Sequence, residues 1–109
     1  MNIPEEFLHF LWKHKFLPAN LYIDQSLEPI QVIKPGLAHK GSGPDFQHAR
    51  IKIGETIWAG NVEIHVKSSD WLKHKHEEDP AYRNVILHVV WENDSPIFYS
   101  NKTPIPTLV

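Results

Sequence analysis

The amino-acid sequence predicts an α/β domain built on a mixed sheet, with its elements in the order helix, strand, strand, strand, helix, strand. Three patterns predict this class. An apolar segment near the N-terminus has the charge placement of a helix, residues 49–67 largely alternate between apolar and polar, and residues 85–91 form an almost unbroken apolar run. Alternation indicates strands with one covered face, whereas an unbroken apolar run indicates a strand covered on both faces, as in parallel pairing.

Residues 4–15 are predicted to form the first helix. Pro4 suits its first position, and the acidic Glu5 and Glu6 at its start and the basic residues 13–15 at its end complement the helix dipole. The residues between them are too apolar for a solvated helix, so one broad face should be buried. A short strand over residues 30–33 follows, ended by Pro35-Gly36.

Two strands joined by a tight turn come next. Residues 49–53 and 57–67 carry the alternating pattern, and Gly54-Glu55 supplies the turn between them. In the second strand, Trp58 shares the apolar face with Val62, Ile64 and Val66, and the opposite face carries Asn61, Glu63, His65 and Lys67. We therefore expect Trp58 to be a buried anchor of the core.

A short second helix is predicted from Asp70, ended by Asp79-Pro80 at the latest. The apolar strand 84–92 follows it, so that strand 57–67, helix and strand 84–92 form a right-handed parallel crossover. Residues 97–99 supply a further edge strand. His88 lies within the apolar run, so we expect a buried core imidazole that needs a hydrogen-bond partner. If strand 84–92 lies beside strand 57–67, the face of Glu63 and His65 can supply that partner.

Composition narrows the function classes. The chain of 109 residues has no cysteine, which excludes disulfides, zinc–thiolate sites and a thiol nucleophile. Its acidic N-terminal stretch does not suit a signal peptide, and no apolar run approaches the roughly 20 residues of a membrane span. We interpret the chain as cytoplasmic, with no membrane partner. The net charge of −2 predicts that any nucleic-acid binding is local, weak and salt-dependent.

One domain is expected over residues 1–109, because a chain of this length forms a single core. The apolar ending at residues 105–109 favours the N-terminal fragment of a longer chain, whose remainder would be a partner of this domain. A local basic rim around the predicted sheet would suit phosphates and consists of Lys40, Arg50, Lys52, Lys67, Lys73 and Lys75. Trp58 and Trp71 are expected to anchor the core, with base stacking as the alternative.

Polar residues on one strand face form the candidate site. Glu63, His65 and Lys67 project from the same face, and Asp45 precedes the strand that the turn folds back alongside them. Two carboxylates brought together need a cation, and hard oxygen ligands suit Mg²⁺ or Mn²⁺ better than Zn²⁺. The alternatives are a solvated strand face and an Asp45 that only caps its turn.

The order of elements, with Pro44-Asp45 before one strand and Glu63-Ile64-His65 on the next, resembles the PD-(D/E)xK nuclease superfamily. This resemblance implies a restriction-endonuclease-like sheet, metal-binding by Asp45 and Glu63, and nucleic acid as substrate. The sequence departs from the pattern at His65, where the superfamily usually has lysine, and Lys67 comes two residues later. The candidate metal ligands are thus Asp45, Glu63 and His65, and the candidate catalytic residues are His65 and Lys67.

A second resemblance covers nearly the whole chain. The segments 43–46, 58–71 and 84–90 are similar to the N-terminal part of a bacterial family catalogued as domain of unknown function 2851, which brings no activity with it. Three functions follow as hypotheses. The first is a metal-dependent, nuclease-like phosphodiesterase. The others are a noncatalytic module that binds nucleic acid or protein, and a hydrolase with a histidine and carboxylate site for Zn²⁺ or Mn²⁺.

Overall fold

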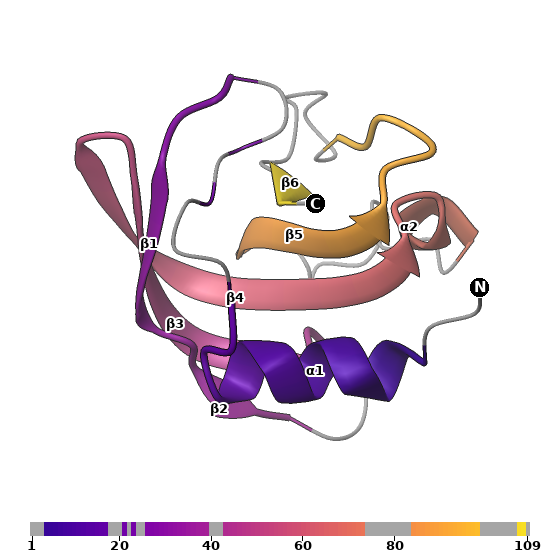
Figure 1. Ribbon diagram of the computed structural model, residues 1–109, viewed down its shortest axis with the longest axis horizontal. Coiled ribbons are helices and arrows are strands. Elements are labelled where there is room, and N and C mark those ends of the chain that lie inside the picture. Colours follow the sequence, from indigo (N-terminus) through magenta and orange to yellow (C-terminus); the bar gives the residue numbers. More distant parts are fainter. Residues whose placement is uncertain are drawn as a thin grey trace.

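A computed structural model describes residues 4–17, 21, 23, 26–39, 43–73, 84–98 and 107–108. Its helices and strands are α1 (Glu5–Lys13), β1 (Ile30–Lys34), β2 (Leu37–Ala38), β3 (Phe46–Ile53), β4 (Thr56–Lys67), α2 (Asp70–Lys73), β5 (Val85–Glu92) and β6 (Thr107–Leu108). The strands form one sheet in the order β1-β3-β4-β5-β6, with β2 paired to β3 (Figure 1). The predicted α/β class with a mixed sheet is confirmed.

The sheet is antiparallel on one side and parallel on the other. β3 pairs antiparallel with both β1 and β4, whereas β4 pairs parallel with β5, and β5 with β6. The predicted turn at Gly54-Glu55 joins β3 to β4, and Gly54 adopts a positive φ of 58°, which glycine tolerates without strain. The predicted parallel pairing of residues 57–67 with 84–92 is confirmed in the register Glu63 to His88.

Two details differ from the predicted strands. β2 was not predicted, because two residues are too few for alternation to show. The edge strand predicted over residues 97–99 is not formed in its described part, where Phe98 makes only a single-residue bridge. The strand next to β5 is instead β6. The predicted continuation of the second helix toward Asp79 lies outside the described residues.

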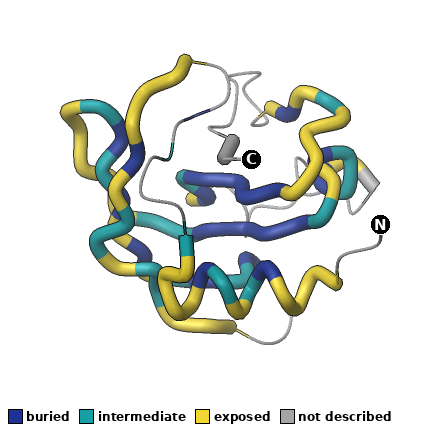
Figure 2. The backbone as a smooth tube through the Cα atoms, viewed as in Figure 1, coloured by how far each residue is buried: buried dark blue, intermediate teal, exposed yellow. Residues whose placement is uncertain are grey.

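α1 lies alongside β4 and covers the face of the sheet that holds the main core (Figures 1 and 2). Leu8 and Trp12 of α1 are buried, and Trp12 Nε1 donates a hydrogen bond to the Pro35 carbonyl at 2.9 Å. The sheet contributes Ile30, Phe46, Ala49, Ile51, Ile53, Val62, Ile64, Leu87 and Val89 to this core. Phe7 and Phe10 are exposed, so the buried face of α1 is narrower than predicted.

The prediction that Trp58 anchors the core is wrong, because 49% of its surface is exposed. Trp58 pairs with the buried Ile51 of β3. The described pairing of β5 with β4 begins only at Asn61, so the stretch of β4 around Trp58 has β3 on one side and no strand from β5 on the other. Trp71 is 1% exposed, as predicted for an anchor.

In the part of the chain that the structure describes, α1 and α2 are both far too short to cross a bilayer, and no helix qualifies as a membrane span.

Candidate functional site

Asp45 and Glu63 meet where β3 ends alongside β4. The pairing of these two strands closes with Phe46 opposite Val62, so the next residues of β4 have no strand partner on that side. Asp45 fills this position. Its backbone N–H donates to Glu63 Oε1 at 3.0 Å, and its Oδ2 accepts the backbone N–H of Ile64 at 2.8 Å. The carboxyl group of Asp45 therefore points to β4. The side chains of Asp45 and Glu63 are also hydrogen-bonded to each other.

Glu63 and His65 occupy one face of β4, as the alternation predicted. Glu63 Oε2 lies 3.4 Å from His65 Nε2, and each residue is only 3% exposed. The face is thus an interior one, and the alternative of a solvated strand face is wrong for these two residues. Glu63 lies between the other two predicted residues and contacts both Asp45 and His65. Of the three, Asp45 has the most contact with solvent, at 24% of its side chain.

The pKa of Glu63 is raised to about 10, mainly by burial and to a smaller extent by the side-chain hydrogen bond and the negative charge of Asp45. Desolvation disfavours the charged form of a carboxyl group, and a second carboxylate beside it adds repulsion. At neutral pH Glu63 therefore holds a proton. A buried carboxyl pair of this kind is stabilised either by that proton or by a cation that replaces it.

His88 of β5 continues the row of polar side chains. His88 Nε2 lies 2.7 Å from His65 Nδ1, and the two rings meet edge to face with centroids 4.9 Å apart. The Trp71 ring of α2 packs against His88 at 5.3 Å. The expectation that His88 is buried and pairs with the face of Glu63 and His65 is confirmed.

Two residues of α1 belong to the same site and were not predicted. His9 Nε2 lies 3.5 Å from Asp45 Oδ2. Burial raises the pKa of Glu5 to about 7, with smaller contributions from the negative charges of Asp45, Asp70 and Glu6. Glu5 and His9 are one helical turn apart and share a face. This spacing was visible in the sequence, but nothing in it indicated that α1 would lie beside Asp45.

Lys67 is not part of this buried row. Its side chain is exposed at the end of β4, two residues beyond His65, and its backbone N–H donates to Asp70 Oδ2 at 3.4 Å. Residues two apart on a strand are separated by about 7 Å. Lys67 is therefore a surface residue beside the site, whereas His65 is inside it.

A protein-family model described as "Protein of unknown function (DUF2851)" matches residues 5–109. The chain belongs to this family. No curated protein and no solved structure matches it. The family match spans the whole row of site residues from Glu5 to His88, so the resemblance read from the sequence to this family is confirmed.

The donor atoms of this DUF2851 chain decide which ions its site suits. Among the residues that the structure describes, no three His, Asp or Glu side chains are arranged to hold one ion together. A structural zinc site needs four such ligands and a catalytic one needs three. Mg²⁺ is usually held by one or two carboxylates together with water and substrate phosphates. The Asp45 and Glu63 pair fits the second pattern.

Proposed function

We propose that this DUF2851 domain is a metal-dependent phosphodiesterase of the nuclease type, with Asp45 and Glu63 as ligands of Mg²⁺ or Mn²⁺. The observation that carries the proposal is the contact between these two acidic residues, which lie eighteen positions apart and are hydrogen-bonded through both backbone and side chain. Burying a second carboxyl group beside the first is costly and serves no packing purpose. A divalent cation is the ligand that such a pair fits.

The order of the elements supports the same proposal. A helix, three antiparallel strands and a short helix followed by a parallel strand resemble the restriction-endonuclease-like core of PD-(D/E)xK nucleases. In that resemblance, Asp45 corresponds to the first acidic position, Glu63 to the second, and His65 to the position where lysine is usual. His65 and Lys67 stay our candidate catalytic residues, with His65 inside the site and Lys67 at its exposed border.

The residues of the chain have separate parts in this proposal. Asp45 and Glu63 would hold the ion, and Glu63 would give up its proton when the ion enters, because a ligating carboxyl must be ionised. When bound, the ion would polarise a phosphoryl oxygen and make a coordinated water more acidic. His65, whose Nε2 lies 3.4 Å from Glu63 Oε2, would donate a hydrogen bond to a phosphate oxygen of the substrate. His9 and Glu5 border the same site from α1.

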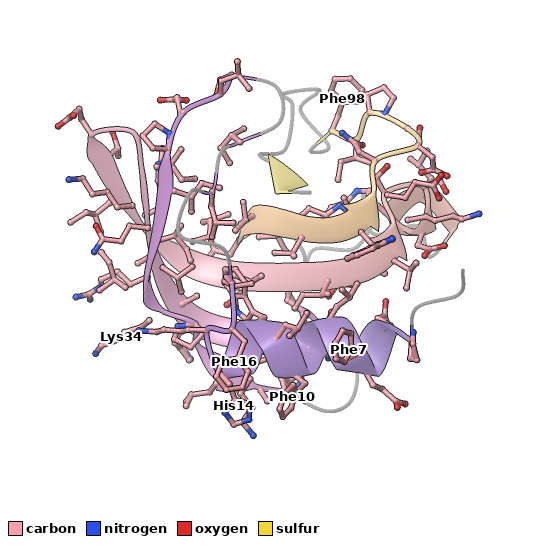
Figure 3. All side chains as sticks on the ribbon, in the orientation of Figure 1. Phe7, Phe10, His14, Phe16, Lys34 and Phe98 are labelled. Atoms are coloured by element: carbon pink, nitrogen blue, oxygen red, sulfur yellow. The ribbon has the colours of Figure 1, made fainter. Side chains whose placement is uncertain are left out.

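A surface at the C-terminal end of α1 suits nucleic acid as the substrate. The exposed rings of Phe10, His14 and Phe16 contact one another there, with centroid distances of 4.7 Å, 5.7 Å and 5.8 Å. Figure 3 shows them on the outer side of α1, with Lys34 beyond the end of the helix. Exposed aromatic rings combined with cations are the usual means of holding single-stranded nucleic acid.

We call the rings of Phe10, His14 and Phe16 the aromatic platform. Several lysines lie beside it. Lys13 is the last residue of α1, and Lys15 Nζ donates to the Ile33 carbonyl at 3.2 Å, which brings Lys34 to the same corner. A chain with a net charge of −2 thus carries a local concentration of positive charge beside exposed rings. Of the basic rim expected from the sequence, Arg50 and Lys67 are exposed and Lys52 is half-buried. Lys40, Lys75 and the side chain of Lys73 lie outside the described residues.

The test is a cleavage assay with labelled single-stranded and double-stranded oligonucleotides of DNA and RNA, with Mg²⁺, Mn²⁺ or no added metal. We expect cleavage that requires the metal. Asp45→Asn and Glu63→Gln should reduce it by about a hundredfold or more, since even the partners of metal ligands contribute 10- to 100-fold. Glu55→Gln, at the exposed turn between β3 and β4, is the matched control. Binding without cleavage under every condition would favour the noncatalytic module.

A further inference from the structure

Two histidines from neighbouring strands share a short hydrogen bond in the interior of the sheet. His65 Nδ1 and His88 Nε2 are 2.7 Å apart, and the two residues are 3% and 0% exposed. Because His65 and His88 are on paired strands and Trp71 packs on the His88 ring, neither ring can turn without disturbing the core. The orientation of both imidazoles is therefore fixed by the fold.

The neighbours of His65 decide which of its nitrogens carries the proton. Glu63 Oε2 lies 3.4 Å from His65 Nε2, and a carboxyl oxygen beside a ring nitrogen is an acceptor for its N–H. A neutral imidazole has one N–H and one bare nitrogen, so a proton on Nε2 leaves Nδ1 as an acceptor. The donor in the 2.7 Å contact is then His88 Nε2.

We propose that His88 is a positioning residue, which holds His65 in the tautomer that carries its proton on Nε2 and presents this N–H to the Asp45 and Glu63 site. A protein usually selects the tautomer of a histidine through the hydrogen bond made by the ring nitrogen that does not face the site. His88 does this from β5, the strand that pairs with β4.

The consequence for chemistry rests on the proposed function. A histidine whose Nε2 carries a proton is a hydrogen-bond donor on that side, so it is neither a metal ligand nor a base there. Lysine, which the resembled nucleases have at this position, is also only a donor. The role that is left for His65 is that of a hydrogen-bond donor that stabilises charge on a phosphate.

Nuclear magnetic resonance of protein labelled with ¹⁵N in its histidines tests the inference directly. Two-bond ¹H–¹⁵N correlation spectra distinguish a protonated ring nitrogen from a bare one, and the loss of signals in His65→Gln assigns the ring. We expect His65 to show a protonated Nε2 and a bare Nδ1 at neutral pH. His88→Gln, which keeps an N–H donor, should preserve this pattern, and His88→Leu should lose it. His14→Gln, at the surface, is the matched control for the spectrum of His65.

Three results would overturn the inference: a proton on Nδ1 alone in the unsubstituted protein, protons on both nitrogens, or the same His65 spectrum in His88→Leu as in the unsubstituted protein. If His88→Leu does not fold, the unsubstituted protein and His88→Gln still decide the matter. The measurement needs no metal and no substrate. A failure to cleave nucleic acid would thus refute the proposed function and leave the tautomer result standing. Likewise, a different tautomer of His65 would refute this inference and leave the cleavage result standing.

Discussion

The backbone N–H of Asp45 donates to Glu63 Oε1 at 3.0 Å across the end of the pairing between β3 and β4. The contact fixes two acidic side chains against each other, and one of them is almost fully buried. Such a pair is stable only when a proton or a cation offsets the repulsion between its oxygens. The consequences for stability and binding can be measured without knowledge of the substrate.

Stability should fall as pH rises above neutrality, and Glu63 should be the main cause. Its pKa is about 10 in the folded protein, against the ordinary value of 4.5 expected of the unfolded chain. Between these values only the folded state holds the proton, so the free energy of unfolding decreases by about 1.4 kcal/mol per pH unit for this group. The pKa of Glu5 is also raised, to about 7, so this group likewise lowers the free energy of unfolding as the pH rises from 4.5 to 7.

Glu63→Gln should remove this dependence, because glutamine has nearly the same shape and no proton to lose. Urea unfolding of both proteins from pH 7 to pH 9 measures the effect, and the variant should become increasingly more stable than the unsubstituted protein toward pH 9. Glu55→Gln serves as the control. Parallel pH profiles for Glu63→Gln and the unsubstituted protein would show that Glu63 is already ionised at pH 7.

Trp71→Ala should destabilise the fold by about 3 to 5 kcal/mol, the cost of removing a buried aromatic side chain. Trp71 is 1% exposed and packs with Val85 and Ile97 as well as with the His88 ring. Trp58→Ala is the matched comparison, because the same substitution at a half-exposed position should cost far less. Equal losses for the two variants in urea unfolding would contradict the difference in burial.

Binding of single-stranded DNA should be weak and should depend on the aromatic platform. Phe16 is 61% exposed, and stacking on one ring contributes about 1 to 3 kcal/mol per base. Phe16→Ala should therefore weaken binding by about fivefold or more in fluorescence anisotropy at low salt. Leu27→Ala, at an exposed apolar position that is not part of the platform, is the control.

The salt dependence of that binding separates stacking from charge. Lys34→Ala should reduce the slope of log affinity against log salt by about one phosphate contact, whereas Phe16→Ala should leave the slope unchanged. Tight binding at several hundred millimolar salt, or an unchanged affinity in Phe16→Ala, would rule out the platform as the binding surface.

The sequence was sufficient to predict the sheet around the site. Period-two alternation correctly located β3, β4 and the face shared by Glu63 and His65, and the unbroken apolar run correctly indicated that β5 lies parallel to β4. These predictions succeed because side chains alternate strictly along a strand, whichever way the rest of the chain folds. The pairing of His88 with the Glu63 and His65 face followed from the same argument.

What the sequence could not predict depends on contacts between distant elements. The places of Glu5 and His9 in the site follow from the packing of α1 beside Asp45, and no local pattern encodes that packing. Trp58 lies on the predicted face but beyond the paired part of β5, so the alternation is right and the expected burial is wrong. Burial depends on where a neighbouring strand begins, which periodicity does not specify.

The central claim is that Asp45 and Glu63 hold one divalent cation, and thermal melting with increasing Mn²⁺ tests it most directly. A ligand that binds only the folded state raises the melting midpoint, by an amount that grows with its concentration. We predict a rise for the unsubstituted protein and for Glu55→Gln, and none for Asp45→Asn or Glu63→Gln. Both site variants should be at least as stable as the unsubstituted protein without metal, because each removes one of two carboxyl groups that are costly to hold together unless a proton or a cation is bound. No rise in the unsubstituted protein, or an equal rise in all four proteins, would contradict the claim.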